Sequence, residues 1–293
     1  MTAADLKSVL GDATFEYVWD NASKAPKGAG KAVCDCAKEW GVKLFTYVSS
    51  AGMYQPTAET EFPMSESTPI KESAGQAQFD NYAVELGLPL VSFRPQYIYG
   101  EKASKFDYID WYFDRLVREL PLPIPEDGTQ KVSLTNSQDV ASILTSPLNN
   151  EAAAIEQRFF NCGSDQLYSY DEVAYLCAEA AGISKDKVMI EHYDSNLFGK
   201  ANFPFRLTNF YVAPDTAKAK LGFEGAKNSL KEDLKWYYEG YKARGGPEKK
   251  MSLVKDWEIC VGSKSSYDVQ SIYEKYDPIP IDTSNAKPLD AKA

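Results

Sequence analysis

The sequence predicts an α/β protein in which a parallel sheet is covered by helices. Three short β-rich runs at 15–23, 44–50 and 90–95 alternate with helical segments at 28–41 and 71–87. The run at 44–50 is almost continuously apolar, as in strands that are covered on both faces. A strand–helix–strand–helix–strand order implies right-handed crossovers, and therefore parallel strands.

The first half of the chain has clear element boundaries. The strand at 15–23 ends in turn-forming residues, and Gly41 is a stop signal after the helix at 28–41. A loop at 52–69 is rich in Thr, Pro, Ser and Glu. It precedes the helix at 71–87, which Gly87 closes.

The second half continues with helices and shorter strands. The segment 107–120 has an apolar face, and the proline-rich stretch 121–125 ends that helix. Further strands are predicted at 132–135 and 159–163, and further helices at 138–148, 170–182, 214–221 and 229–244. The composition changes after Gly245, and 277–293 are predicted to be an extended or disordered arm.

Composition excludes several classes of protein. His192 is the single histidine, which argues against a histidine metal site or a Ser-His-Asp triad. The five cysteines have irregular spacings, and Cys34 and Cys36 are too close for a zinc knuckle, so a reducing compartment is expected. No apolar run approaches the length of a membrane span.

The net charge of −10 opposes binding to nucleic acid unless the basic residues are segregated. Residues 200–250 hold 11 Lys and Arg against 6 Asp and Glu. Aromatic residues are interleaved with these cations, a pattern that suits single-stranded RNA. The alternative is a solvated helical face whose aromatic residues belong to the core. The candidate RNA contacts are Lys218, Lys220, Lys227, Lys231 and Lys235.

A series of motifs resembles the extended short-chain dehydrogenase/reductases, in the epimerase–dehydratase branch. The motifs are Val-Ser-Ser-Ala-Gly-Met-Tyr at 48–54, Glu-Ser-Thr-Pro at 66–69 and Phe-Arg-Pro-Gln-Tyr-Ile-Tyr-Gly at 93–100. The resemblance covers roughly residues 12–242. It implies a Rossmann-like, doubly wound parallel sheet with a small C-terminal α/β domain.

Within this branch the chain is most similar to the chloroplast stem-loop-binding proteins. The likeness lies in Ser-Phe-Arg-Pro-Gln-Tyr at 92–97, Trp-Tyr-Phe-Asp-Arg at 111–115 and Leu-Cys-Ala-Glu-Ala-Ala-Gly at 176–182. It implies plastid RNA binding, stem-loop endoribonuclease activity or association with ribosome-like assemblies. It also implies a place in the chloroplast stroma or at the stromal thylakoid face, although residues 1–5 do not resemble a transit peptide.

The resemblance also predicts the domain organisation. Residues 1–135 are expected to form a partial Rossmann-like domain, 136–246 a small C-terminal domain partly interleaved with the sheet, and 247–293 an extended arm. The strand at 15–23 corresponds to the fourth strand of the family fold. The sheet is therefore expected to be N-terminally truncated, with the first βαβ units, roughly 70–80 residues, absent.

A dinucleotide site in this fold needs a glycine-rich turn after the first strand. Gly28-Ala-Gly30 follows a different strand, so no cofactor is expected, and NAD(P) would require a preceding segment. The residues that would have faced such a cofactor are Asn21, Ser49, Arg94, Gln96 and Tyr97. Arg94 is predicted either to contact a phosphate or to form a buried ion pair.

The acid–base residues of the family are also replaced. Active members use a Ser and a Tyr-x-x-x-Lys pair, in which the lysine lowers the tyrosine pKa. Here Ser50 fills the serine position, but the pair becomes Gln76 and Asp80. Glutamine is neither an acid nor a base, and Asp80 reverses the helpful charge. The chain as given is therefore not expected to be a working dehydrogenase or epimerase.

The residues at 15–20 would form an unpaired edge of the sheet. Exposed edges of this kind are aggregation templates unless something covers them. The candidates are the N-terminal residues, the C-terminal arm or a partner subunit.

Magnesium-assisted RNA cleavage would need a cluster of carboxylates. Asp110 and Asp114 share a helical face, and Asp107 and Asp139 are further candidates. A solvated acidic face is the favoured alternative, so no metal site is assigned.

These observations predict a binding function. The leading expectation is a plastid RNA-binding protein of the stem-loop-binding type, with possible residual metal-dependent endoribonuclease activity. One alternative is a non-catalytic subunit of a large protein assembly. Another is an NAD(P)-linked nucleotide-sugar enzyme whose N-terminal segment is missing.

Overall fold

A computed structural model describes residues 2–276, and these divide into two compact units that are interleaved along the chain. Unit 1 comprises Met1–Ile98, Ser133–Asp165 and Tyr211–Lys227. Unit 2 comprises Tyr99–Val132, Gln166–Phe210 and Asn228–Ala293. The predicted division at residue 135 differs from this arrangement, because β8 and three helices that follow residue 135 pack in the sheet or against it in unit 1.

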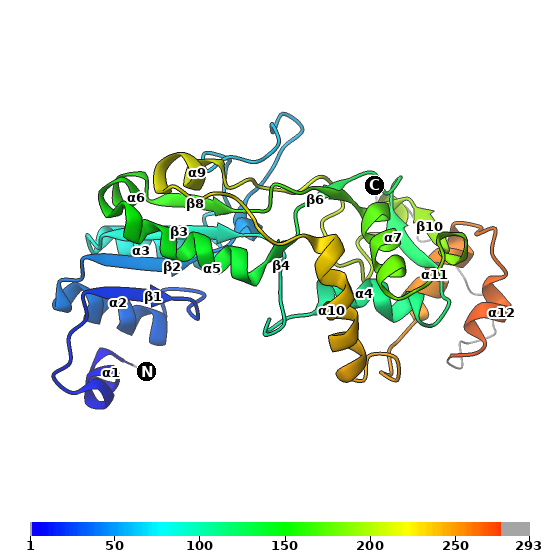
Figure 1. Cartoon of the computed structure of the whole chain (residues 1–293), viewed down its shortest axis with the longest axis horizontal. Coiled ribbons are helices and arrows are strands. Elements are labelled where there is room, and N and C mark those ends of the chain that lie inside the picture. The colour runs from blue at the N-terminus through cyan, green and yellow to red at the C-terminus, as the bar shows by residue number, and fades with distance from the viewer. Residues whose placement is uncertain (1, 277–293) are drawn as a thin grey trace. The chain divides into compact units, whose positions relative to one another are not determined.

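Unit 1 contains a four-stranded parallel sheet in the order β1-β2-β3-β8 (Figure 1). The strands are β1 (Tyr17–Asp20), β2 (Leu44–Val48), β3 (Leu90–Pro95) and β8 (Phe159–Cys162). In register, Trp19 lies opposite Thr46, Tyr47 opposite Ser92, and Phe93 opposite Phe160. The predicted strands and their parallel pairing are confirmed.

Helices cover both faces of this sheet. One face packs α2 (Ala29–Trp40) and α3 (Gly75–Glu85) against Phe45, Tyr47 and Leu90. The other packs α5 (Ser137–Thr145), α6 (Glu151–Gln157) and α9 (Asp215–Leu221) against Val91, Phe93 and Phe160. Successive strand residues point to opposite faces, so a continuously apolar strand fills two hydrophobic layers.

The edge strand β1 bonds only to β2 among the residues that the structure describes. Phe15 and Trp19 are 40% and 39% exposed there. The N-terminal residues do not cover this edge, because they form α1 (Ala3–Leu10), which packs against α2. A Thr2–Asp5 capping box favours that helix, so the idea that the N-terminal residues pair with β1 was wrong.

Unit 2 is built around α4 (Asp107–Leu116), α7 (Tyr170–Ala180) and α10 (Leu230–Ala243). Two small sheets accompany them. β5 (Leu122–Pro125) pairs in parallel with β10 (Ile190–Tyr193), and β6 (Lys131–Val132) pairs antiparallel with β9 (Tyr168–Ser169). The proline-rich stretch 121–125 was expected only to end a helix, but Leu122 and Ile124 are fully buried in β5.

The remaining short elements complete the described chain. The strand predicted at 132–135 is divided between β6 and β7 (Thr135–Asn136), and β4 (Ile98–Tyr99) follows β3 along the chain. Unit 2 also contains α8 (Ser195–Phe198) and the short 3₁₀ helix η3 (Lys185–Lys187), and unit 1 contains η1 (Ala51–Met53) and η2 (Ser146–Asn149).

Residues 247–276 are folded, which corrects the prediction of an extended arm from 247. They contain α11 (Val254–Gly262) and α12 (Val269–Tyr273). Leu253, Trp257 and Cys260 form a buried cluster with Tyr273 and Leu120. The i, i+4, i+7 spacing of the first three residues is helical, but it is too short to stand out in a polar sequence. The predicted extended or disordered arm at 277–293 lies outside the described residues.

Across the part of the chain that the structure describes, no helix combines the length and the apolar character needed to cross a bilayer.

Candidate functional site

The carboxyl edge of the parallel sheet brings together most of the residues that the sequence singled out. Asp20 ends β1, Ser49 and Ser50 follow β2, and Gln96 follows β3. Asp80 reaches this edge from α3, the helix that carries the Tyr-x-x-x-Lys pair in active enzymes of the resembled family. Ligands of open α/β sheets bind at such an edge, so this is the natural candidate site.

Asp80 is a buried hydrogen-bond acceptor. The Ser49 hydroxyl donates to its Oδ2 at 3.3 Å and the Ser92 hydroxyl to its Oδ1 at 2.7 Å. The residue is 2% exposed, and burial raises its pKa to about 6, against hydrogen bonds from Ser92 and Ser49 and the charge of Arg94. Asp80 therefore ties α3 to β3 and to the end of β2 instead of offering a charge to a ligand.

The other two residues of the predicted degenerate cleft, Ser50 and Gln76, differ in their contacts. The Ser50 hydroxyl accepts the Gly52 amide at 3.0 Å and caps η1. Gln76 lies half-buried in the first turn of α3. The nearby Tyr82 accepts a hydrogen bond from Lys31 and donates one to Asp35, and burial together with Asp35 raises its pKa. None of these side chains is a general base at neutral pH.

Arg94 belongs to an internal polar network and is 4% exposed. Its Nη1 donates to the Tyr54 hydroxyl at 3.0 Å and to the Glu66 carbonyl at 3.1 Å, and its guanidinium lies over the Phe159 ring. Tyr54 in turn donates to Asn161, and burial raises the Tyr54 pKa to about 12. The prediction that Arg94 forms a buried ion pair was wrong, because Tyr54, the Glu66 carbonyl and Phe159 are uncharged partners. The other prediction, a phosphate contact, is not favoured, because the guanidinium is buried.

The other predicted vestigial cofactor residues are divided between interior and surface. Gln96 is buried, and its Oε1 accepts the Val212 amide at 3.0 Å. Tyr97 is half-buried with φ 39°, and its carbonyl accepts the Thr135 amide. Asn21 is exposed in the loop after β1. Of the residues predicted to line the cleft, Asn21 is therefore exposed, and Ser50, Gln76 and Tyr97 are half-buried.

Two glycines near this edge serve close packing. A Cβ on Gly30 would lie 2.6 Å from the Ala25 carbonyl, and one on Gly75 would lie 2.3 Å from the Lys24 carbonyl. Both glycines let α2 and α3 approach the loop that follows β1. This gives Gly30 of the Gly28-Ala-Gly30 stretch a packing role.

Three exposed lysines at this edge were missed by the sequence reasoning. Lys24 and Lys27 lie in the loop after β1, and Lys71 lies four residues before Gly75. No carboxylate of the described residues forms an ion pair with any of them. The position of Lys24 and Lys27 immediately after the predicted strand at 15–23 was the available signal, but the count of charges by segment concealed it. Lys71 begins the predicted helix at 71–87, and the sequence contained no comparable signal for it.

The five lysines predicted to contact RNA are divided between the two units, and their surroundings differ. Lys218 pairs with Asp165 at 2.5 Å, Lys227 with Glu224 at 2.9 Å, and Lys231 with Glu179 at 3.6 Å. Lys220 and Lys235 are exposed, and no carboxylate of the described residues pairs with them. Lys218, Lys220 and Lys227 belong to unit 1, whereas Lys231 and Lys235 belong to unit 2.

Most of the aromatic residues near these lysines are core. Phe203, Phe205, Phe210 and Tyr237 are each at most 3% exposed. Phe205 packs against Tyr170, and Tyr237 against Phe113. The alternative that the aromatic residues belong to the core is therefore confirmed for these four positions.

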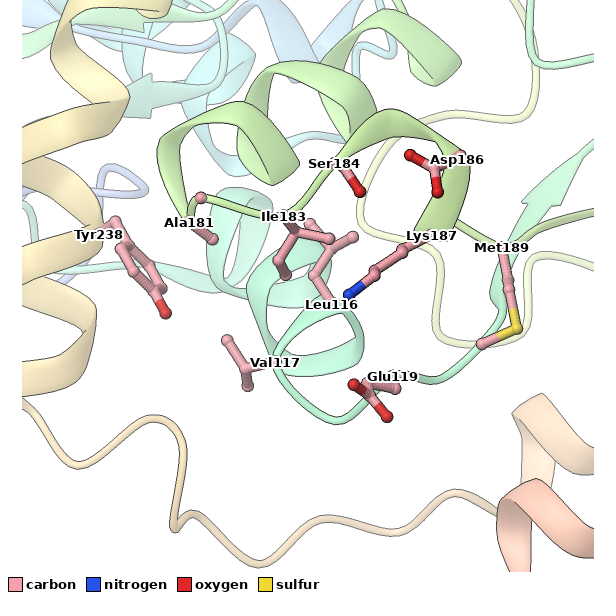
Figure 2. Close-up of a pocket in the computed structure, with 11 residues that line it drawn as sticks. Leu116, Val117, Glu119, Ala181, Ile183, Ser184, Asp186, Lys187, Met189 and Tyr238 are labelled. Carbon is pink, nitrogen blue, oxygen red and sulfur yellow. The ribbon is translucent and has the colours of Figure 1, made fainter.

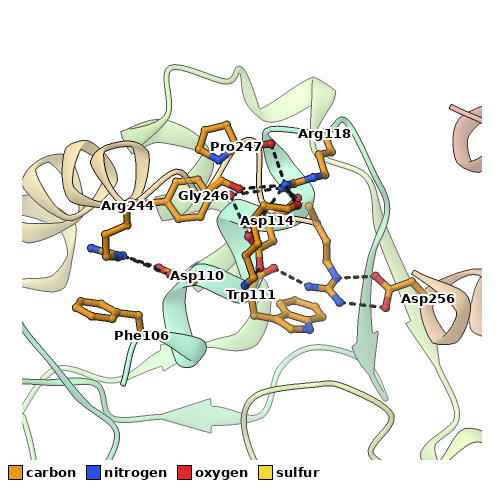
Figure 3. A network of polar contacts seen from close by, with 12 residues as sticks. Phe106, Asp110, Trp111, Asp114, Arg118, Arg244, Gly246, Pro247 and Asp256 are labelled. Carbon is orange, nitrogen blue, oxygen red and sulfur yellow. Dashed lines mark hydrogen bonds and ion pairs between the residues drawn. The ribbon is translucent and has the colours of Figure 1, made fainter. Parts of the chain in front are cut away.

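The aspartates of α4 hold unit 2 together (Figure 3). Asp110 accepts from Tyr237 at 2.9 Å and Arg244 at 3.0 Å, and Asp114 accepts from Tyr241 at 3.0 Å and Lys249 at 3.1 Å. Asp114 is 4% exposed, so the favoured alternative of a solvated acidic face was wrong. Asp107 pairs with Lys105, and Asp139 accepts the Lys227 amide in unit 1.

These four aspartates do not gather into a cation site. No group of three or more His, Cys, Asp or Glu side chains within residues 2–276 is placed to hold a metal ion.

The comparisons with known proteins agree with this geometry. The sequence model of the NAD dependent epimerase/dehydratase family matches residues 27–163, so this stretch of the chain is similar to that family. More particularly, the chain is 29% identical over 223 residues to the chloroplast stem-loop binding protein of 41 kDa b of Arabidopsis thaliana. That alignment covers 75% of this chain, which spans 57% of the relative's length.

Solved structures support the fold. An epimerase from Methanothermobacter thermautotrophicus has a TM-score of 0.63 at 19% identity, over 83% of this chain and 76% of that one. The UDP-glucose 4-epimerase of Thermotoga maritima has a TM-score of 0.61 at 18% identity, over 83% and 82% of the two chains. The predicted Rossmann-like α/β class and the family resemblance are confirmed.

Proposed function

We propose that this chain is a non-dehydrogenase member of the epimerase/dehydratase fold that binds RNA in plastids. The relative named above is a chloroplast stem-loop binding protein, which supports both the ligand class and the compartment. The finer parts of this proposal, an RNA stem-loop as ligand and any residual nuclease activity, rest on that similarity alone.

The observation that carries the proposal is the buried Asp80 carboxylate in the place of a catalytic lysine. A lysine there favours a tyrosine phenolate, because its positive charge stabilises the anion. Asp80 has the opposite charge and is already engaged by Ser49 and Ser92. Gln76, at the tyrosine position, has no ionisable proton in the physiological range. The chemistry that defines dehydrogenases of this fold therefore has no acid–base residue here.

Phosphate contacts are proposed for lysines that no carboxylate of the described residues neutralises. Lys24, Lys27 and Lys71 meet this description at the carboxyl edge of the sheet, and Lys220 and Lys235 meet it elsewhere. A free ammonium releases a condensed counterion when it meets a phosphate, whereas a paired one must first leave its carboxylate. The paired Lys218, Lys227 and Lys231 are therefore weaker contacts.

This difference gives a matched pair of variants. Lys24→Gln/Lys27→Gln/Lys71→Gln and Lys218→Gln/Lys227→Gln/Lys231→Gln remove the same formal charge. In fluorescence anisotropy with a stem-loop RNA, the first variant is expected to weaken binding more. It should also reduce the slope of log affinity against log salt by about 0.9 for each phosphate that is no longer neutralised. Equal effects of the two variants would reject the assignment of these lysines to phosphates, and failure of the full chain to bind at low salt would reject RNA binding itself.

A second candidate function, a subunit of a large assembly, is favoured by the edge strand β1. Its outer side is unbonded among the described residues, and Trp19 is 39% exposed beside it. A strand from a partner subunit would satisfy those backbone groups. Deletion of 247–293 is a poor test of this idea, because Trp257, Cys260 and Tyr273 are core residues of unit 2.

Trp19→Lys tests the edge directly, because a charge on an edge strand opposes pairing. Val9→Lys on α1 is the control, since Val9 is exposed but lies outside the sheet. Loss of a large complex on gel filtration with Trp19→Lys alone supports a partner at β1. The alternative of a nucleotide-sugar enzyme would instead show a cofactor-dependent absorbance change.

A further inference from the structure

Two features of unit 2 are not used by the functions considered above. One is a groove of 670 Å³ beside α4, η3 and α10, lined by Leu116, Ile183 and Met189 (Figure 2), but no described residue indicates what it holds. The other is the contact that the single histidine of the chain, His192, makes at the start of α7. That contact joins three elements of unit 2, which are β10, α7 and the loop between β5 and β6.

His192 extends from β10 to the first turn of α7. Its Nε2 lies 3.0 Å from Oδ1 and 3.2 Å from Oδ2 of Asp171, so the imidazole meets both oxygens of the carboxylate. The side chain of His192 is 40% exposed and that of Asp171 is 25% exposed. Water can therefore supply and remove the imidazole proton while the two side chains stay in contact.

The loop 126–130 between β5 and β6 closes against this pair. A Cβ on Gly128 would lie 2.0 Å from Oδ1 of Asp171 and 2.7 Å from Nε2 of His192, so any other residue would push the pair apart. The Gly128 carbonyl accepts the Asp171 amide at 3.2 Å, and the Gln130 carbonyl accepts the Tyr170 amide at 3.2 Å. The loop thus satisfies the first two amides of α7, which have no partner within the helix itself.

The charged groups that act on His192 are acidic. Asp171 faces it from α7, Asp127 faces it from the loop, and Glu191 precedes it on β10. The Thr129 amide and hydroxyl hold Asp127, because both donate to its Oδ1, at 3.0 and 2.7 Å. The hydrogen bond with Asp171 raises the pKa of His192 above its ordinary value of 6.5, against partial burial of the imidazole.

The direction of the pH dependence follows from that raised pKa. The folded chain holds the imidazole proton more tightly than the unfolded chain does. The contact therefore contributes its full stability below pH 6.5, and this contribution is lost as the pH rises through the higher folded-state pKa. Carboxyl groups ordinarily titrate at about pH 4, so the imidazole is the group of this cluster that changes charge near neutral pH.

We propose that His192 and Asp171 form a pH-sensitive latch that fixes the loop 126–130 to the start of α7. A charged imidazole holds the Asp171 carboxylate beside Gly128, and the loop covers the first amides of the helix. A neutral imidazole loses the charge attraction, and the loop separates from the helix by local opening while the rest of unit 2 stays folded. Because the pair is exposed to solvent, the proton changes the ratio of closed to open loop by at most about fivefold.

Proton NMR of the full chain tests the titration. Because His192 is the single histidine, its imidazole signals can be followed without interference from another one. Their midpoint should lie above 6.5 in the parent and move toward 6.5 in Asp171→Asn, which removes the charge but keeps the shape of the side chain. Glu179→Gln is the matched control, because it removes an exposed carboxylate elsewhere on α7 that pairs with Lys231 and should leave the midpoint unchanged.

Hydrogen exchange tests the latch itself. The Tyr170 and Asp171 amides report on the loop, and the Ala181 amide at the other end of α7 is the reference. After correction for intrinsic exchange, protection of the first two relative to the reference should fall about twofold to fivefold between about pH 6 and about pH 8.5. His192→Gln should give the lower protection at both pH values. His192→Lys should give the higher protection at both, because it keeps a positive charge.

Three results would overturn the proposal. A midpoint of His192 at or below 6.5, or one that Asp171→Asn does not change, means that the carboxylate does not hold the imidazole proton. Exchange of the Asp171 amide that parallels that of Ala181 at every pH means that the loop does not open separately. A fall in protection that persists in His192→Gln means that another group titrates. None of these measurements involves RNA, so the latch and the proposed RNA binding stand or fall separately.

Discussion

Replacement of Asp80 by asparagine is expected to stabilise unit 1 at neutral pH. The folded-state pKa of Asp80 is raised to about 6 from an ordinary value of 3.8, chiefly by burial. A raised carboxyl pKa means that the folded state holds the proton more tightly than the unfolded state. Stability is therefore lost as the pH rises from about 4 through 6, and the full penalty remains above that range.

The size of the effect follows from that difference of roughly two pKa units, which corresponds to about 2–3 kcal/mol above pH 6. Asparagine avoids the penalty because it is neutral. Its Oδ1 still accepts from Ser92, and its Nδ2 donates to Ser49, so both hydrogen bonds of Asp80 are replaced.

The assay is native-state hydrogen exchange of the β2 and β3 amides in the parent chain and in Asp80→Asn. The two proteins should differ little at pH 4, and the variant should be more stable by about 2–3 kcal/mol at pH 7. Comparison of the two chains removes the titration of every other group. A variant that is less stable at pH 7, or a difference that does not change with pH, would show that Asp80 is not a buried charge of this kind.

Two further changes test unit 2. Arg115→Ala should lower the free energy of unfolding of this unit by about 3–5 kcal/mol, because Asp256 stays buried without the guanidinium that binds both of its oxygens at 2.7 and 3.0 Å. Urea titration measures the change. The double variant Arg115→Met/Asp256→Leu should recover most of the lost stability. Glu119→Gly should stabilise unit 2 by about 1 kcal/mol, because glycine adopts φ 52° without strain. Glu119→Ala is the control, because alanine retains the Cβ. Equal stability of the two variants would mean that the backbone at residue 119 is not strained.

Much of the fold could be predicted because its signals are local. The strands β2 and β3 are continuous apolar runs, and Gly41 and Gly87 follow the helices α2 and α3. The strand β5 could not be predicted, because a stretch containing two prolines is a poor strand candidate until a partner such as β10 is known. The helix α11 was missed for a similar reason, since its apolar residues are few and Asp256 is a core residue only in the presence of Arg115.

The candidate site shows the same limit. The sequence placed Asp80 at the lysine position, but it did not identify its partners. Ser92 meets Asp80 because it shares the face of β3 that Leu90 turns toward α3. Likewise, Lys218 and Lys231 were predicted from local charge, whereas their carboxylate partners Asp165 and Glu179 lie more than 50 residues away in the sequence. Pairings across such separations depend on the fold and not on composition.

We propose that the carboxyl edge of the unit 1 sheet binds RNA and does not catalyse hydride transfer. Fluorescence anisotropy of the full chain with a stem-loop RNA, at about 50 mM and about 200 mM salt, tests this most directly. We predict binding at the lower salt concentration that weakens steeply at the higher one. No binding at the lower concentration, in a preparation that reduces or oxidises a nicotinamide cofactor with a sugar nucleotide, would contradict the proposal.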